Sequence, residues 1–237
     1  MTRYICFCSA SAILLLSATV AQAEGFGINA TRLIYPENEK SISVTLRNTM
    51  RNSPYLVQTN VSAEQSKMVA APFIVTPPLF RLEPQSTNQV RITFKGSALP
   101  QDRESVFYFN AAGIPASSSP AKEQQTAGVR GMAQFGVGNI IKLFYRPDGL
   151  KVTSAEAQKN LIFSRDLKGL RVSNESPYFV SFASMKIAGR GVALDTPQQK
   201  MIAPFSSYVY PTSAKSGDIS WETINDVGGI GAHTGRF

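Results

Sequence analysis

The longest alternation of apolar and other side chains lies between residues 129 and 147, near the middle of the chain. Ala133, Phe135, Val137 and Ile141 share one parity within it, which predicts a β-strand. At about 3.3 Å per residue, a strand well beyond the usual length of about five or six residues either crosses a whole sheet or extends past it. An apolar strand that extends past its sheet is either an aggregation hazard or a means of pairing with another chain.

Shorter alternating segments, separated by turn residues, fill the rest of the chain. No segment of helical length shows helical periodicity, and many short, regularly spaced strands are typical of β-sandwiches. We therefore predict an all-β fold. The expected strands are residues 28–34, 42–46, 55–61, 73–75, 79–82, 90–94, 106–110, 129–145, 161–163, 170–172, 178–182, 185–187, 192–194, 208–210 and 219–224.

The two ends of the chain and one central turn predict its division into domains. Residues 1–23 combine one basic residue, an apolar run and the ending Ala-Gln-Ala, which is typical of a secretory signal peptide; a buried N-terminal helix is the alternative. The turn RPDG at residues 146–149 marks a boundary. We expect one sandwich in residues 24–147 and a second in 148–237, with the glycine-rich end from residue 228 as a frayed tail.

Charge and cysteine usage narrow the function classes. Removing residues 1–23 takes away one basic residue and both cysteines, so the net charge falls from +8 to +7 and disulfides play no part. The basic residues are dispersed, with no nucleic-acid-binding motif, which argues against nucleic acid as a partner. The remainder has no apolar stretch of membrane-spanning length, so we expect an exported protein that is not inserted in a membrane.

The sequence lacks the residues that most catalytic mechanisms require. His233 is the only histidine, which argues against histidine-based triads and against His/Cys metal sites, and we predict no metal and no cofactor. The 16 acidic residues leave open a pair of carboxylates of the kind that glycosidases use. We expect a protein that is not an enzyme, with a carbohydrate-active hydrolase as the alternative.

Two basic residues stand within apolar strands. Arg32 shares a face with Ile28 and Ala30, and Lys142 interrupts the apolar run at residues 140–144. A desolvated charge without a partner costs several kcal/mol, so each cation is expected to face a cleft or an anion. The alternative is two unrelated surface cations.

Seven ordered sequence blocks resemble the periplasmic pilus-assembly chaperones of the chaperone/usher pathway, the PapD-like family. The resemblance spans nearly all of the chain after residue 23 and is looser between residues 148 and 220. The blocks are residues 30–36 (ATRLIYP), 55–58 (YLVQ), 73–82 (FIVTPPLFRL), 99–105 (LPQDRES), 114–115 (IP), 142–147 (KLFYRP) and 223–226 (TIND).

The resemblance implies two immunoglobulin-like sandwiches in an L-shaped arrangement and an ATP-independent function in the periplasm. Such chaperones bind pilus subunits that lack their last strand, lend them the long strand, and deliver them to an outer-membrane usher. By this resemblance Ala133, Phe135 and Val137 fill the subunit's groove, while Arg32 and Lys142 hold its C-terminal carboxylate.

The resemblance also assigns Glu104, Arg146 and Asp226 to ionic contacts between the two domains. The small Ala133 departs from the family's run of bulky aliphatic residues, so the subunit's groove is narrow there or the register differs by a step. Alternatively, the groove residues pack their own domain's core. A secreted adhesin or structural β-protein is the alternative class that shares two sandwiches but has no need for cations in apolar strands.

Overall fold

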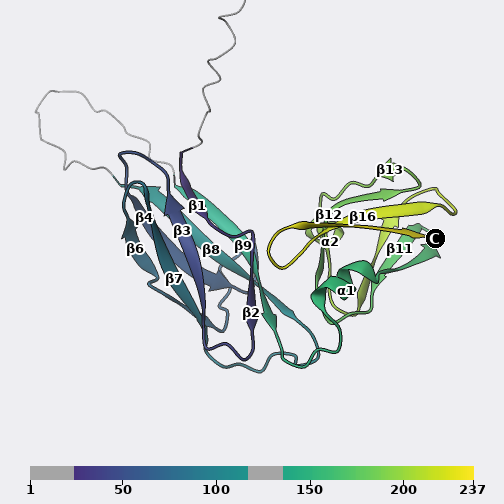
Figure 1. The fold of residues 1–237 in the computed structure, drawn as a ribbon, viewed down its shortest axis with the longest axis horizontal. Coiled ribbons are helices and arrows are strands. Elements are labelled where there is room, and N and C mark those ends of the chain that lie inside the picture. The colour runs from purple at the N-terminus through teal and green to yellow at the C-terminus, as the bar shows by residue number, and fades with distance from the viewer. Residues whose placement is uncertain (1–23, 117–135) are drawn as a thin grey trace, which may run out of the picture.

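The computed structural model describes residues 24–116 and 136–237. The expected signal peptide, the groove residues Ala133 and Phe135, and the beginning of the long strand lie outside these residues. The described chain forms two β-sandwiches that meet at an angle, joined by the segment that follows the last strand of the first one (Figure 1). The prediction of an all-β fold with two sandwiches is therefore confirmed. No helix in residues 24–116 and 136–237 is long and apolar enough to cross a membrane.

The first sandwich packs a sheet of four strands against a sheet of five. The order of the first sheet is β1-β3-β7-β5, and that of the second is β2-β9-β8-β4-β6. The strands are β1 (Phe26–Ile28), β2 (Arg32–Pro36), β3 (Ile42–Asn48), β4 (Tyr55–Ser62), β5 (Phe73–Thr76), β6 (Leu79–Leu82), β7 (Ser86–Phe94), β8 (Ser105–Pro115) and β9 (Val137–Arg146).

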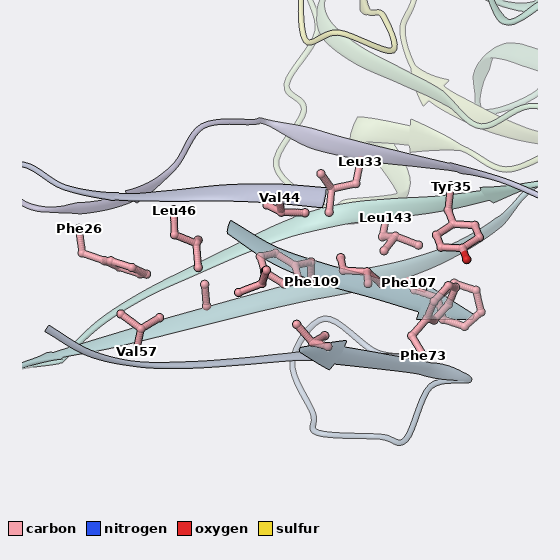
Figure 2. Packing of buried hydrophobic residues seen from close by; sticks show 14 of the residues in the cluster. Phe26, Leu33, Tyr35, Val44, Leu46, Val57, Phe73, Phe107, Phe109 and Leu143 are labelled. Atoms are coloured by element: carbon pink, nitrogen blue, oxygen red, sulfur yellow. The ribbon is translucent and has the colours of Figure 1, made fainter. Parts of the chain in front are cut away.

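The core of this sandwich is aromatic where it approaches the second domain. Tyr35, Phe73 and Phe107 gather there between the sheets, with ring centroids 5.5 Å apart for Tyr35 and Phe73 and 5.0 Å apart for Phe73 and Phe107 (Figure 2). The buried Tyr35 hydroxyl accepts a hydrogen bond of 3.1 Å from the backbone N–H of Phe94. Each such ring contributes about 1.5–3 kcal/mol by burial, so β2 is held firmly against the core.

The expected first strand, residues 28–34, is wrong in two respects. It is two strands, β1 and β2, which pair in different sheets: β1 with β3 and β2 with β9. On β2 the odd-numbered residues Leu33 and Tyr35 point into the core, and the even-numbered Arg32 and Ile34, which were expected to share a face with Ile28, point outward. Because the chain crosses from one sheet to the other between β1 and β2, the alternation of β1 does not continue into β2.

The second sandwich packs a three-stranded sheet, β10-β11-β15, against the sheet β13-β12-β16-β17, with β14 also paired to β12. Two short helices complete it, each begun by a threonine in a capping box. The elements are α1 (Ser154–Lys159), β10 (Ile162–Asp166), β11 (Gly169–Asn174), β12 (Val180–Ile187), β13 (Arg190–Gly191), α2 (Pro197–Lys200), β14 (Met201–Ile202), β15 (Ser206–Pro211), β16 (Asp218–Ile224) and β17 (Ile230–Arg236).

Three expectations for this domain are wrong. Residues 192–194 form no strand, and the expected strands 178–182 and 185–187 are one strand, β12, with an irregularity between Phe182 and Ser184. The glycine-rich end is not a frayed tail, because β17 pairs along its whole length with β16. Glycine suits this strand: a Cβ at Gly235 would lie 3.3 Å from the Trp221 ring.

The two sandwiches share a structural device. A buried asparagine ends β3 in the first domain and β11 in the second, and each donates from its side-chain amide to three backbone carbonyls. Asn48 donates to Ser53, Leu82 and Glu83, and Asn174 to Tyr178, Ile202 and Ala203. In the second domain the bond from Asn174 to the carbonyl of Tyr178 closes the turn at residues 174–178, and this turn contacts the first domain.

Candidate functional site: the domain junction and the open edge of β9

The parallel pairing of β2 with β9 places two cations side by side. Arg32 is in register with Lys142, and their neighbours Leu33 and Leu143 point into the core. Since side chains alternate along a strand, both cations point outward from the same face of the sheet. The structure thus brings together the two basic residues that the sequence singled out.

Arg32 reaches the second domain. Its Nη1 donates a 2.8 Å hydrogen bond to the carbonyl of Ile224 at the end of β16, and its guanidinium lies 5.7 Å from the centroid of the Phe144 ring. Its Nε is buried and has no hydrogen-bond partner among the described residues. Burial lowers the pKa of Arg32, while the charges of Asp226 and Glu104 work in the opposite direction. An arginine whose donors are only partly used can accept an anionic ligand.

Lys142 carries the larger electrostatic cost. Burial, the charge of Arg32 and that of Lys200 lower the pKa of Lys142 to about 8. Neither Lys142 nor Arg32 lies within 4.0 Å of a carboxylate oxygen in the part of the chain that the structure describes. Two neighbouring, partly desolvated cations without an acid form a site in which an anion lowers the free energy.

One edge of β9 is open next to this pair. On one side β9 pairs with β8 from Val137 to Tyr145, but on the other side β2 pairs only from Lys142 onward. Within the described residues, the backbone from Val137 to Ile141 therefore has a free row of hydrogen-bonding groups. Val137 and Ile140 are 43% and 48% exposed and lie on opposite faces of the strand. An extended, apolar, unpaired edge is the surface on which another chain adds a strand.

Arg146 joins the two domains at the end of β9. Its Nε donates to Glu104 Oε1 at 2.8 Å, and its Nη1 and Nη2 donate to the two carboxylate oxygens of Asp226 at 2.8 and 3.0 Å. The guanidinium also lies 4.9 Å from the centroid of the Tyr178 ring. The three residues assigned to interdomain ionic contacts thus do meet, and we call them the ionic bridge.

The bridge is partly desolvated, and the pKa values of its members respond accordingly. Glu104 is 4% exposed, and burial raises its pKa although Arg146 opposes the shift. Burial also works to raise the pKa of Asp226, but the hydrogen bonds and charge of Arg146 outweigh it and lower that pKa. The carboxylates in turn raise the pKa of Arg146 despite its burial.

Main-chain groups complete the junction, and sequence reasoning missed them. The backbone N–H of Phe179 donates to Glu104 Oε2 at 2.9 Å, and the backbone N–H of Glu104 donates to the carbonyl of Pro177 at 2.9 Å. One side chain adds to these main-chain bonds: the Ser154 hydroxyl donates to Asp226 at 3.0 Å. Backbone donors carry no sequence signature, so no residue pattern could have revealed them.

Two immunoglobulin-like sandwiches, an open strand edge and an ionic bridge between the domains define the architecture of a pilus-assembly chaperone. Residues 25–151 match the family described as the pili and flagellar-assembly chaperone PapD N-terminal domain, and residues 156–235 match the pili assembly chaperone PapD C-terminal domain. The chain belongs to this family, which confirms the resemblance seen in the sequence. The boundaries predicted at residues 23 and 147 stay predictions.

Relatives and solved structures agree with this assignment. The chain is 38% identical over 232 residues to the probable fimbrial chaperone protein ElfD of Escherichia coli K12, covering 96% of this chain and 94% of ElfD. It resembles the periplasmic chaperone SfaE with a TM-score of 0.70 and 32% identity over 90% of this chain and 98% of SfaE. A structure of the Salmonella enterica SafA pilin in complex with the SafB chaperone gives a TM-score of 0.75 and 29% identity over 91% of this chain and 97% of that one.

Proposed function

We propose that this chain is an ATP-independent periplasmic chaperone that stabilises pilus subunits by donor-strand complementation and delivers them to an outer-membrane usher. The observation that carries the proposal is the open edge of β9 directly beside the unneutralised pair Arg32 and Lys142. A solved complex of a related chaperone with a pilin supports the choice of client.

The cation pair anchors the client by its terminal carboxylate. Arg32 supplies a planar fork of donors and Lys142 a point charge, so together they suit a small, doubly accepting anion. An anion here offsets the cost of holding both cations partly out of water, whereas an additional neutral group would not. Because the pair stands where the free edge begins, anchoring the client's end also sets the register of the added strand.

The free edge then supplies the affinity. Backbone hydrogen bonds along β9 hold the client's strand, and alternate side chains fill its groove. In the register implied by the family, the groove residues are Ala133, Phe135 and Val137, of which Val137 lies in the described part and is half-exposed. Burying a valine or phenylalanine side chain contributes about 1.5–3 kcal/mol, and an alanine much less.

The ionic bridge orients the two domains rather than contacting the client. The hydrogen bonds that the Arg146 guanidinium donates go to Glu104 of the first domain and Asp226 of the second. The same engagement argues against the hydrolase alternative at this place, because both carboxylates already accept from arginine.

Delivery to an usher requires a surface that stays accessible while a client occupies β9. Leu56, Leu79 and Ile114 are 43%, 56% and 49% exposed and lie on the outward face of β4, β6 and β8. Leu56 is directly opposite Ile114 in the β4–β8 ladder, and the next outward position of β4, Gln58, is opposite Leu79 in the β4–β6 ladder. Adjacent exposed apolar side chains mark a docking surface, which we assign to the usher.

Co-expression with a candidate pilus subunit in the periplasm tests the chaperone function. We expect a one-to-one complex that is lost in Arg32→Ala and in Lys142→Ala while each variant stays folded. Recovery of an unchanged amount of complex from both variants would contradict the anchor. An adhesin or a hydrolase would give no complex with the wild-type chain at all.

Val137 and Ile140 provide a matched pair for the groove. Both side chains are about equally exposed on the same strand but face opposite ways, so a glutamate introduces the same charge at either place. We expect Val137→Glu to weaken client binding strongly and Ile140→Glu to weaken it little. Equal losses would show that the groove register is wrong.

A further inference from the structure

A concave site lies where the two domains and their linker meet, away from Arg32, Lys142 and the edge of β9. It is a cavity of about 620 Å³. Its walls come from residues 101–102 before β8, the linker at 149–152, helix α1, the turn at 175–177, and Phe205. The volume is within the range of about 300–1,000 Å³ that is typical of small-molecule sites.

The walls are apolar and exposed. Val152, Ile162 and Phe205 are 38%, 45% and 49% exposed, so three of the large apolar side chains that the described chain leaves in water line this one cavity. Water in contact with such walls is displaced favourably by an apolar body. The apolar walls therefore favour a ligand with an aromatic or aliphatic part.

Phe205 is held in an unfavourable backbone conformation. Its φ is +52°, in the left-handed region that is uncommon for aromatic residues and costs roughly 1–3 kcal/mol. The backbone N–H of Phe205 donates to the carbonyl of Ser176, another wall residue. The guanidinium of Arg103 lies over this ring, 4.8 Å from its centroid, in the geometry of a cation–π contact.

The rim of the cavity is acidic, in contrast to the whole chain, whose net charge is +8. Asp102 is paired with Arg103 at 2.7 Å, which leaves Glu156 and Glu175 against the single cation Lys151. Glu156 uses Oε2 to accept from the N–H and hydroxyl of Thr153. A positively charged group thus finds the carboxylates of Glu156 and Glu175 beside an apolar wall to which Phe205 contributes its ring.

We propose that this cavity binds a small amphipathic organic cation, an amine or guanidine on an aromatic or aliphatic body. The apolar part lies against Val152, Ile162 and Phe205, and the cationic head lies toward Glu175 and Glu156. This site is separate from the client-binding surface and does not rest on it.

The cavity wall is connected to the ionic bridge. The Tyr178 hydroxyl donates to the carbonyl of Val152 at 2.8 Å, and the Tyr178 ring lies under the guanidinium of Arg146. The carbonyl of Pro177, a wall residue, accepts from the N–H of Glu104. A ligand in the cavity therefore contacts Val152 and Pro177, whose carbonyls accept hydrogen bonds from Tyr178 and from Glu104 of the ionic bridge.

Three probes of equal shape and different charge test the proposal on the exported chain: 3-phenylpropylamine, 3-phenylpropanol and 3-phenylpropionate. We expect saturable amide shifts in an NMR titration at Gly149, Val152, Ser176 and Phe205. We also expect the amine to bind roughly threefold more tightly than the alcohol, because an exposed ion pair contributes a modest free energy of this order. The propionate should bind most weakly. Absence of saturable shifts at these amides up to about 10 mM, the weak end for ligands of this size, would overturn the site. Equal binding of amine and propionate would overturn its charge preference.

Two variants localise the site without threatening the fold. Glu175→Gln should remove the preference for the amine over the alcohol, whereas the matched change Glu39→Gln, on an exposed carboxylate of the first domain, should leave it intact. Phe205→Asn keeps a residue that tolerates positive φ and should weaken all three probes. Unchanged affinity in Phe205→Asn would contradict the assignment of the ring to the binding wall.

Discussion

Replacing Lys142 by methionine should stabilise the protein while abolishing client binding. Its pKa of about 8, against 10.5 for an ordinary lysine, means that folding favours the neutral amine. At about 1.4 kcal/mol per pKa unit the penalty is about 3 kcal/mol at pH 7. Because the side chain is partly exposed, water screens part of this cost. We expect Lys142→Met to raise the free energy of unfolding by about 1–3 kcal/mol, with the methionine keeping the apolar stem in place.

The pH dependence of this stability gain identifies the charge of Lys142 as its cause. Since the pKa of Lys142 is lower in the folded state, the penalty is complete below pH 8 and fades as pH rises from about 8 to 10.5. The difference between Lys142→Met and wild type should therefore fall by about half between pH 7 and pH 9.5, because by then the folded amine is neutral and only the unfolded one still binds a proton.

Urea unfolding followed by far-UV circular dichroism measures this difference. Fluorescence of Trp221, the only tryptophan and a buried residue of the second sandwich, follows that domain separately. Lys95→Met, on an exposed lysine, is the control and should change stability by less than about 0.5 kcal/mol. A Lys142→Met variant that is less stable than wild type at pH 7, or a gain that does not depend on pH, would refute the reasoning.

Two further substitutions test the domain junction. Arg146→Met leaves the buried Glu104 without its cation and should cost about 3 kcal/mol in urea unfolding, whereas Arg81→Met, which breaks an exposed pair, should cost less than about 1 kcal/mol; similar losses would contradict a structural role for the bridge. Gly228→Ala and Gly149→Ala both place alanine at positive φ, but only the former adds a clash with the loop before β2. Gly228→Ala should therefore reduce client recovery in the co-expression assay more than Gly149→Ala, and equal recovery would mean that this contact does not position the anchor.

The sequence predicted the all-β fold and the candidate anchor because both depend on local patterns. Short alternating segments specify strands, and a charge in an apolar strand is conspicuous at any position, so Arg32 and Lys142 could be selected before their register was known. The prediction that Arg32 shares a face with Ile28 and Ala30 was wrong because β1 and β2 belong to different sheets. Alternation within a segment does not reveal where a chain crosses from one sheet to the other.

Long-range contacts decided what the sequence could not reveal. The glycine-rich end becomes β17 because β16 offers it a complete ladder, although its own residues have little strand propensity. The carbonyl of Ile224 and the N–H of Phe179 serve the junction through backbone atoms, which every residue type possesses. Such partners are fixed by the fold and can be found only from the structure.

The junction places two cations where they reduce stability. Arg32 and Lys142 repel one another and are partly desolvated, and the chain supplies no acid within ion-pair distance among its described residues. The two carboxylates whose charges act on Arg32, those of Asp226 and Glu104, are engaged by Arg146. In the proposed function, the client's carboxylate supplies the anion that this pair lacks among the described residues.

Hydrogen exchange on the backbone amides of Val137–Ile141 tests the central claim most directly. The exported chain should be measured alone and in complex with a pilus subunit. If the free edge of β9 receives the client's strand, some of these amides exchange quickly in the free protein and become strongly protected in the complex, while those of β17 do not change. A complex that forms with unchanged exchange between residues 137 and 141 would contradict strand donation.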